Sequence, residues 1–302
     1  MKILITGASG FLGKYLIDQL LREKDSYHIY GLWSSSKPRI SEKIAKIQCD
    51  ILLEKEVDEM IERIKPDIVF HLAGKTHGLL EELLSVNVVG TRNILEAVRM
   101  HCQKTHIFVV SSSAVYGYAG SYPIPEAASL FPLSDYGVSK AAEELVVKQY
   151  EKQYSLSTTV LRPFNAIGPG QGTNFLVGSI TNQIKDILCG AKENIELRNT
   201  SSYRDYIDVR DVANAFVTVI KHMCTGTYNI GSGNAWSTKE IIDCCSTLTG
   251  KSFSLTLTDP CGKDAIPVQI SNNNKMKKIG WNQTICMEQS LSDMLGGEDF
   301  LL

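Results

Sequence analysis

The spacing of two side chains in the middle of the chain suits proton transfer. Tyr136 and Lys140 are four residues apart in a stretch, residues 136–154, whose pattern predicts a helix, so both side chains should lie on one face. A free phenol has a pKa of about 10, and a fixed cation nearby favours its ionised form. Lys140 would therefore bring the pKa of Tyr136 toward the range useful for acid or base catalysis. A surface tyrosine and lysine on an amphipathic helix is the alternative, and the rest of the chain must decide between the two.

A glycine-rich turn near the N-terminus is a second sign of chemistry. Residues 2–6 form a short apolar run typical of a buried parallel strand, and a helical pattern through residue 21 begins after Gly7, Gly10 and Gly13. Such a turn lets backbone N–H groups approach a pyrophosphate at the positive end of a helix, because glycine lacks the Cβ atom that would block it. The spacing is GxxGxxG rather than GxGxxG, and an ordinary tight turn is the alternative. The position between strand and helix favours dinucleotide binding.

The end of the next predicted strand, residues 27–33, bears on the choice of dinucleotide. An acidic residue at this place normally holds the ribose hydroxyls of NAD, and none is present. Ser34 and Arg39 instead offer a hydroxyl and a cation that suit a 2′-phosphate. NADPH is therefore favoured over NADH, although NADH stays possible and a solvated loop is the alternative. Asp50, after the run 45–49, could accept a hydrogen bond from the adenine amino group or could cap the helix predicted for residues 54–64.

Further β-like runs alternate with helical stretches and predict where these side chains meet. The runs 68–74 and 105–110, with a helix predicted for residues 87–100 between them, complete five strands in sequence. This alternation indicates an α/β fold with a doubly wound parallel sheet. Ligands of such sheets bind beyond the carboxyl ends of the strands, where Ala73, Gly74 and the hydroxyls of residues 111–113 should lie. Small residues at that edge would let a cofactor pass close to the backbone.

Composition excludes several classes of partner. The 302 residues carry 31 basic and 33 acidic side chains, a formal net charge of -2, so small molecules rather than nucleic acid or an anionic membrane are the expected partners. The eight cysteines are scattered without a CxxC pair or a His–Cys cluster, which predicts buried free thiols and no metal site. The chain starts with an apolar strand rather than a signal sequence, and no run reaches the roughly 18 apolar residues of a membrane span. We therefore expect a cytoplasmic protein.

Together these motifs make the chain resemble an extended short-chain dehydrogenase/reductase that acts on nucleotide sugars. The resemblance covers nearly the whole chain, and the motifs that carry it are Gly7-x-x-Gly10-x-x-Gly13, Asp50, His71-Leu-Ala-Gly74, Asn87, Ser111-Ser-Ser-Ala-Val-Tyr-Gly117, Tyr136-x-x-x-Lys140, Arg162-Pro-Phe-Asn165 and Arg204-Asp-Tyr-Ile-Asp-Val-Arg-Asp211. Within this family, residues 164–171 and the segment from Arg204 are most similar to GDP-4-keto-6-deoxy-mannose reductases and related 6-deoxy-talose-forming enzymes. Those enzymes reduce a 4-keto group with NAD(P)H.

The resemblance implies a role for each of these residues. Tyr136 would donate the proton, Ser112 would orient the sugar carbonyl, and Lys140 would bind the nicotinamide ribose and keep Tyr136 poised, while the cofactor supplies the hydride. Further cofactor contacts are expected from Gly7, Gly10, Phe11, Leu12, Gly13, Ser34, Arg39, Asp50, Ile51, Leu72, Ala73, Gly74, Asn87 and Pro163. Contacts to the nucleotide sugar are expected from Lys75, Thr76, Ser113, Ala114, Asn165, Asn174, Phe175 and Arg204, with Lys263 and Asp264 as candidates near the base or ribose. A surface pair, Arg204–Asp205 or Arg210–Asp208, is the alternative to diphosphate binding by Arg204.

The two positions after Ser112 separate the possible reactions. Dehydratases of this superfamily typically carry a carboxylate there, because elimination of water needs an acid and a base beside the sugar. Ser113 and Ala114 cannot easily do that work. The sequence therefore favours NAD(P)H-dependent reduction of the 4-keto group of an NDP-4-keto-6-deoxy-hexose over 4,6-dehydration. A 4-epimerase with a retained NAD is the main alternative, and a non-catalytic dinucleotide-binding protein is a further one.

The resemblance also divides the chain into two domains. Residues 1–167 with about 207–230 should form the dinucleotide-binding Rossmann domain, and residues 168–206 and 231–302 a smaller α+β substrate domain. A homodimer is expected through the helices that hold residues 87–100 and 136–154, where family members often pair. The identity of the nucleotide, the configuration of the sugar and that of the product alcohol do not follow from the sequence.

Overall fold

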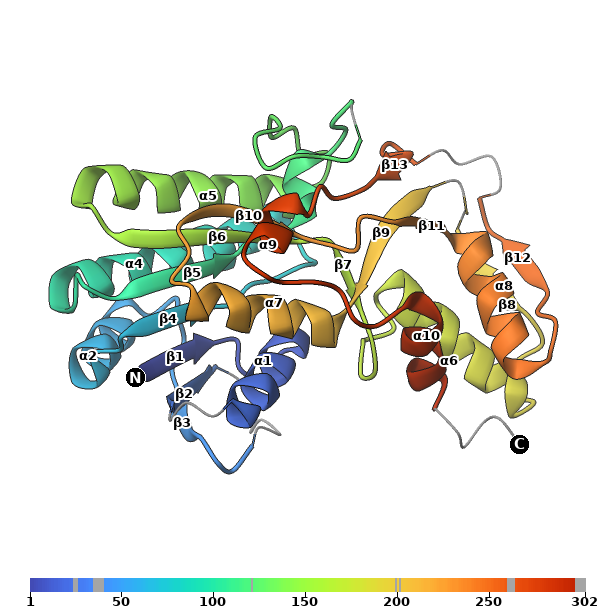
Figure 1. Cartoon of the computed structure of the whole chain (residues 1–302), viewed down its shortest axis with the longest axis horizontal. Coiled ribbons are helices and arrows are strands. Elements are labelled where there is room, and N and C mark those ends of the chain that lie inside the picture. Colours follow the sequence, from blue (N-terminus) through green and yellow to red (C-terminus); the bar gives the residue numbers. More distant parts are fainter. Residues whose placement is uncertain are drawn as a thin grey trace.

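A parallel sheet forms the centre of the larger of two lobes (Figure 1). The computed structural model describes residues 1–23, 27–34, 41–120, 122–198, 200, 202–259 and 264–296. Within them the sheet has seven strands in the order β10-β6-β5-β4-β1-β2-β3. Their bounds are β1 Lys2–Thr6, β2 His28–Trp33, β3 Ala45–Gln48, β4 Ile68–His71, β5 His106–Val110, β6 Ser157–Pro163 and β10 Gly226–Ile230. The predicted doubly wound α/β fold is confirmed.

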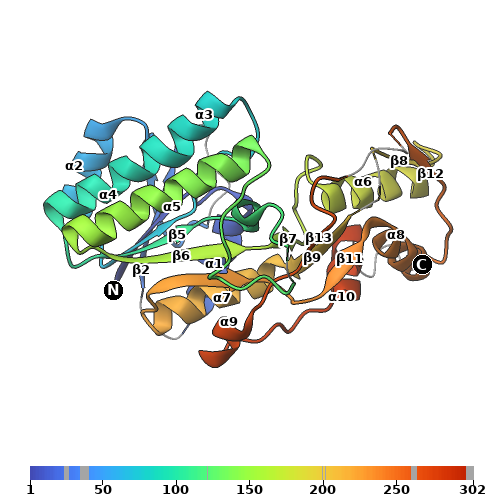
Figure 2. The same ribbon diagram turned by 90° about the horizontal axis from the view of Figure 1, so that it is seen from above.

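Helices cover both faces of this sheet, as Figure 2 shows from above. Helices α1 (Phe11–Arg22) and α7 (Val209–Lys221) pack together on one face, and α2 (Glu54–Ile64), α4 (Gly90–His101) and α5 (Asp135–Tyr154) lie on the other. In α2, the helical spacing of Val57, Met60, Ile61 and Ile64 accounts for its buried face. The strands between two covered faces read as continuous apolar runs for the same reason.

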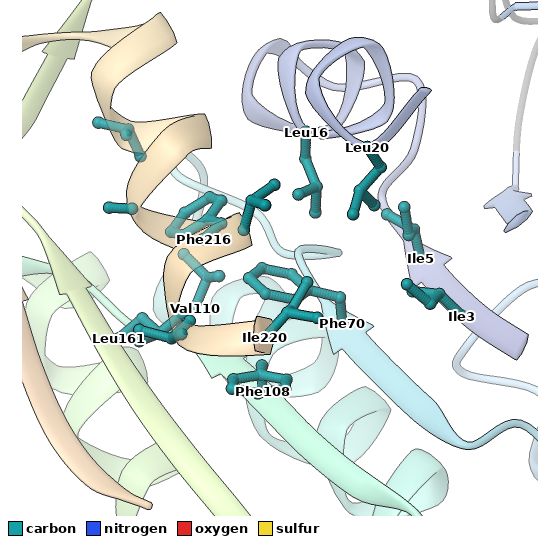
Figure 3. Close-up of a cluster of buried hydrophobic side chains, with 14 of the residues drawn as sticks. Ile3, Ile5, Leu16, Leu20, Phe70, Phe108, Val110, Leu161, Phe216 and Ile220 are labelled. Atoms are coloured by element: carbon teal, nitrogen blue, oxygen red, sulfur yellow. The ribbon is translucent and has the colours of Figure 1, made fainter. Parts of the chain in front are cut away.

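The core of the first face is built from aromatic and branched side chains of the sheet and of α1 and α7 (Figure 3). Phe70 on β4 stacks on Phe108 on β5 with ring centroids 5.4 Å apart, and it meets Phe216 of α7 at 4.9 Å. All three rings are fully buried. Full burial of such a side chain stabilises a fold by about 1.5–3 kcal/mol, so this cluster holds β4 and β5, whose carboxyl ends carry the site, in fixed register.

The smaller lobe is built from separate stretches of the chain that follow β6 and β10. It contains the sheet of β7 (Asn165–Ile167), β9 (Tyr203–Asp208), β11 (Ala235–Ser237) and β13 (Val268–Gln269), and the pair β8 (Ile195–Leu197) and β12 (Leu255–Leu257). Its helices are α6 (Leu176–Leu188), α8 (Thr238–Thr249) and α10 (Met287–Leu295). A capping box between Ser237 and Glu240 starts α8, and Gly250 in the left-handed conformation ends it. Helix α9 (Asn274–Lys278) packs back on β10 of the larger lobe.

Three local expectations differ from the structure. The helix predicted for residues 87–100 begins at Gly90, after helix α3 (Leu80–Leu84) and a π-helical turn, Ser85–Val89. Asp50 does not cap α2, because its carboxylate accepts from the N–H of Leu52 and the cap position belongs to Leu53. Cys189 and Cys286 are exposed rather than buried. In the described part of the chain, no helix is long and apolar enough to cross a membrane.

Candidate active site

The glycine turn lies where the strand order reverses, between β1 and β4. Gly7 has φ 66°, and a Cβ atom added there would lie 2.7 Å from the amide nitrogen of Ala73. A Cβ atom on Gly13 would lie 2.4 Å from the carbonyl oxygen of Gly7. Only glycine fits at these positions, and the turn leads directly into the N-terminus of α1. This cradle suits a dinucleotide pyrophosphate, since the crevice at such a switch point and a helix N-terminus both favour it.

The loop after β4 is pinned to the neighbouring helices. The N–H of Lys75 donates to Asn87 Oδ1 at 2.7 Å, and Asn87 Nδ2 donates to the Lys75 carbonyl at 2.9 Å and to Ser139 Oγ at 2.8 Å. Gly74 stays exposed, and a Cβ atom on it would lie 3.0 Å from Asn87 Oδ1 and 3.9 Å from Lys140 Nζ. The backbone of residues 73–75 and the Lys140 ammonium therefore border one space.

The start of α5 brings Tyr136 to Ser112. Ser134 caps this helix by accepting from the N–H of Gly137 at 3.1 Å. A Cβ atom on Gly137 would lie 2.7 Å from the carbonyl oxygen of Ala114, so the helix touches the loop after β5 directly. Ser112 opens the short 3-10 turn of that loop and accepts from the N–H of Ala114 at 3.1 Å. A hydrogen bond joins the hydroxyls of Ser112 and Tyr136.

The electrostatics of Tyr136 differ from the expectation. Burial raises the pKa of its phenol above the usual value, and this effect outweighs the lowering by Lys140 and by the hydrogen bond to Ser112. Lys140 therefore acts in the predicted direction, but the net pKa of Tyr136 is raised, not lowered. A tyrosine with a raised pKa holds its proton and suits the role of a donor better than that of a base.

Lys140 has a partner that the sequence did not reveal. The lysine is 4% exposed, and its ammonium contacts the carboxylate of Glu143, which is fully buried. The residues are three apart on α5, a spacing that places them on one face of a helix. That spacing was the available signal, but a charged residue at this position is usually solvated, so the pattern alone does not indicate a buried pair.

A second buried ion pair fixes α5 to the sheet. Arg162 on β6 binds Glu144 in bidentate fashion, with N–O distances of 2.8 and 2.6 Å, and the Ser111 hydroxyl donates to the same carboxylate at 2.6 Å. Arg162 also donates to the Tyr116 hydroxyl at 2.8 Å. These contacts tie the loop that holds Ser112 to the helix that holds Tyr136.

Several of the expected substrate residues have partners within the chain. Ser113 is buried, and its hydroxyl donates to Gln269 Oε1 at 3.1 Å, while Gln269 Nε2 donates to the Ser113 carbonyl at 3.0 Å. Asn165 Nδ2 donates to the Asp205 carbonyl at 2.9 Å. Asn174 and Phe175 are exposed, and the Phe175 ring contacts the His77 ring at 5.7 Å.

Arg204 forms an ion pair, but its partner is Asp264 rather than the adjacent Asp205. Its guanidinium donates to Asp264 Oδ2 at 2.7 Å and to the Ile266 carbonyl at 2.6 Å. The Arg210–Asp208 pair is present, and Asp205 instead accepts from backbone and hydroxyl donors. Diphosphate binding by Arg204 therefore requires that it share or exchange Asp264.

The adenosine end of the expected cofactor site is partly described. Ser34, Asp50 and Gln48 line a cavity of about 530 Å³ at the edge of the sheet. Arg39 and Lys263 lie outside the described residues. No group of side chains in the described part of the chain is arranged to hold a metal ion.

A switch-point glycine turn, a Ser–Tyr–Lys trio and a second, smaller lobe are together typical of the extended short-chain dehydrogenases/reductases that modify nucleotide sugars. The family model for GDP-mannose 4,6 dehydratase matches residues 4–294, and the chain belongs to that family.

Relatives in the family catalyse different reactions. The chain is 30% identical to GDP-6-deoxy-D-talose 4-dehydrogenase of Aggregatibacter actinomycetemcomitans, over 92% of this chain and 91% of that protein. It is 28% identical to UDP-glucose 4-epimerase of Mycolicibacterium smegmatis, over 97% and 96%. The structure of RMD from Pseudomonas aeruginosa in complex with NADPH superposes with a TM-score of 0.85 at 26% identity, covering 99% of this chain and 98% of that one.

Proposed function

We propose that the protein reduces the 4-keto group of an NDP-4-keto-6-deoxy-hexose with NADPH, NADH being the possible substitute. The observation that carries this proposal is the hydrogen bond of Tyr136 to Ser112, with the charge of Lys140 acting on the same phenol and the Lys140 ammonium bordering Gly74 of the loop after β4. The similarity to a 4-dehydrogenase of a 6-deoxy sugar nucleotide, whose reaction is the reverse of such a reduction, supports it. The NADPH in the related solved structure supports the choice of cofactor.

In this proposal each member of the trio has one task. Bound cofactor supplies a hydride to the carbonyl carbon. Ser112 holds the carbonyl oxygen, Tyr136 gives that oxygen its proton, and Lys140 holds the nicotinamide ribose and stabilises the phenolate left on Tyr136. The raised pKa of Tyr136 favours this direction, because the phenol is protonated when the carbonyl arrives.

The environment of residues 113 and 114 supports reduction rather than dehydration. The Ser113 hydroxyl is engaged with Gln269, and Ala114 offers a methyl group. Neither can remove a proton from the sugar and return it to a leaving hydroxyl. The expected division of labour follows: the larger lobe binds the dinucleotide, and the smaller lobe holds the sugar nucleotide through Asn174, Phe175 and Arg204, with Lys75 and Thr76 across the opening.

The test is NADPH oxidation by the purified protein across NDP-4-keto-6-deoxy sugars with GDP, dTDP, UDP and CDP. We expect oxidation with at least one of them and its loss in Tyr136→Phe, which removes the proton and keeps the ring. No oxidation with any of these sugars would overturn the proposal.

A 4-epimerase is the second candidate, because relatives with that activity match nearly the whole chain. An epimerase must keep its NAD through both half-reactions. Purified protein that carries a tightly bound, non-exchanging NAD would favour the epimerase, whereas exchange of NADPH on the time scale of turnover would favour the reductase.

We also propose a homodimer through α4 and α5. Four large apolar side chains are exposed on or next to these helices: Val89 by 47%, Met100 by 58%, Val138 by 40% and Leu145 by 64%. The two helices lie side by side on the outer face of the larger lobe (Figure 2). Exposed apolar side chains on two neighbouring helices suit contact with a second copy of the chain.

A further inference from the structure

A buried carboxylate lies next to the lysine of the trio. The carboxylate of Glu143 contacts the Lys140 ammonium, and neither side chain is more than 5% exposed. A buried ion pair persists only when hydrogen bonds or further charges compensate both partners. The surroundings of Glu143 therefore decide whether the pair is ionised.

His71 is connected to Glu143 through the Thr91 hydroxyl, and hydrogen bonds determine which ring nitrogen of His71 carries the proton. Thr6 Oγ1 accepts from the N–H groups of Leu72 at 3.2 Å and Ala73 at 3.0 Å, which leaves its own hydrogen for His71 Nδ1, 2.7 Å away. With Nδ1 accepting, neutral His71 carries its hydrogen on Nε2. The tautomer is assigned by this pattern of partners.

The line of donors continues to the carboxylate. His71 Nε2 lies 2.9 Å from Thr91 Oγ1, and Thr91 Oγ1 lies 2.9 Å from Glu143 Oε1 and 2.6 Å from the Asn87 carbonyl. Thr91 Oγ1 receives the hydrogen of His71 Nε2, and its own single hydrogen has two acceptors within reach, Glu143 Oε1 and the Asn87 carbonyl. A carboxylate can accept on both oxygens, and Glu143 faces the Thr91 hydroxyl at Oε1 and the Lys140 ammonium at Oε2.

No other charge takes the place of Glu143 beside Lys140 among the described residues. On α5 the neighbouring acid, Glu144, is bound by Arg162 of β6. On β4, His71 is neutral, since burial and then the charge of Lys140 lower its pKa to about 3. Burial raises the pKa of Glu143 above its usual value, the charge of Glu144 adds to that rise, and Lys140 and Thr91 act against it without cancelling it. The remaining titratable neighbour is Tyr136, whose pKa Glu143 raises.

We infer that Glu143 is a positioning residue for proton donation: its carboxylate fixes the Lys140 ammonium beside Tyr136 and cancels part of the positive field at the phenol oxygen. This inference rests on the proposed function, because it concerns the proton that Tyr136 delivers. With Glu143 in place, Tyr136 keeps its proton to a higher pH than Lys140 alone would allow. Reduction requires the protonated phenol, so the carboxylate extends activity toward alkaline pH.

The variant that tests this is Glu143→Gln, which keeps the shape and the acceptor for Thr91 but removes the charge. We expect the alkaline limb of the pH profile of kcat to move to lower pH by about one pH unit. Glu151→Gln is the matched control, since Glu151 lies on the same helix and pairs with Lys152. Its profile should coincide with that of the wild type. Glu143→Asp, which retains the charge, should restore part of the difference.

A second readout needs no substrate. Tyrosine labelled with ¹³C at Cζ reports ionisation of each phenol, and Tyr136→Phe assigns the resonance of Tyr136. We expect the titration of Tyr136 to move to lower pH in Glu143→Gln, even if none of the sugars tested for the proposed function is reduced. An unchanged titration in folded Glu143→Gln would overturn the inference while leaving the proposed reduction intact.

A measurement on the wild type covers the case in which Glu143→Gln does not fold. Glutamate labelled with ¹³C at Cδ reports the charge of Glu143, with Glu143→Asp to assign its resonance. We expect the carboxylate form at pH 7. A protonated Glu143 at that pH would contradict the inference, because a neutral carboxyl cannot cancel the field of Lys140.

Discussion

Replacement of Gly137 by alanine should slow turnover and lower the stability of the fold. The added Cβ would lie 2.7 Å from the carbonyl oxygen of Ala114 and 2.9 Å from Pro132 Cβ. Ordinary van der Waals contact begins near 3.4 Å, so the start of α5 and the loop after β5 must separate by roughly 0.7 Å. Tyr136 stands on one side of this contact and Ser112 on the other. The substitution therefore widens the distance across the proposed catalytic pair.

The size of the effect follows from how strictly proton transfer depends on position. A misplacement of about 1 Å can slow an enzyme by about 100-fold, so we expect kcat to fall by roughly 10- to 100-fold in Gly137→Ala. Alanine favours a helix over glycine by about 1 kcal/mol, which offsets part of the strain in the free energy of unfolding. NADPH affinity should change little, because the glycine turn after β1 is not touched.

The assay is steady-state NADPH oxidation with the sugar nucleotide found in the substrate panel, together with fluorescence titration of NADPH and urea unfolding. Lys148→Ala, an exposed position on the same helix, is the control for handling and expression. If Gly137→Ala turned over within about twofold of the wild type while Tyr136→Phe was inactive, the argument that this contact sets the geometry of the pair would be refuted.

Three further perturbations have defined outcomes. Arg162→Met should lower the free energy of unfolding by about 3–5 kcal/mol, because it leaves Glu144 buried without its partner, and adding Glu144→Leu should restore most of the loss in urea unfolding. Leu145→Glu should convert a dimer to a monomer in sedimentation velocity, and a monomeric wild type would disprove the proposed interface. Acidification should destabilise the fold: burial lowers the pKa of His71 to about 3 and of His106 to about 4, so the unfolded chain alone binds protons as pH falls below about 6.5. At pH 5 each histidine should lower the free energy of unfolding by about 2 kcal/mol. Between pH 7.5 and pH 5 the free energy of unfolding of His106→Asn should therefore fall by about 2 kcal/mol less than that of the wild type.

Local sequence signals predicted most of the fold and which residues would lie at the carboxyl ends of its strands. The spacing of the glycines after β1 predicts a tight turn, and the spacing of Tyr136 and Lys140 predicts that both lie on one face of a helix. The apolar runs predicted the strands of the large sheet. Because the carboxyl ends of parallel strands meet at one edge of the sheet, residues that follow different strands can be predicted to lie close together. This is why the sequence could predict that the trio and the turn lie at the same edge of the sheet.

The partners of these residues could not be predicted in the same way. Gln269 forms a hydrogen bond with Ser113, which lies 156 positions away in the sequence. Arg204 forms an ion pair with Asp264 and not with the adjacent Asp205. Such contacts depend on how the smaller lobe folds back, which no local pattern encodes. The net pKa of Tyr136 was misjudged for a related reason, because the extent of its burial is a property of the assembled site.

The edge strand β10 and helix α7 return to the large sheet only after the chain has built part of the smaller lobe. An isolated fragment that ends at residue 167 would lack both, and it would expose the edge of β6 and the apolar face of α1 that α7 covers. The two lobes are therefore not separate modules: the smaller lobe cannot be exchanged without disturbing the strand and helix of the larger lobe that follow it in the chain.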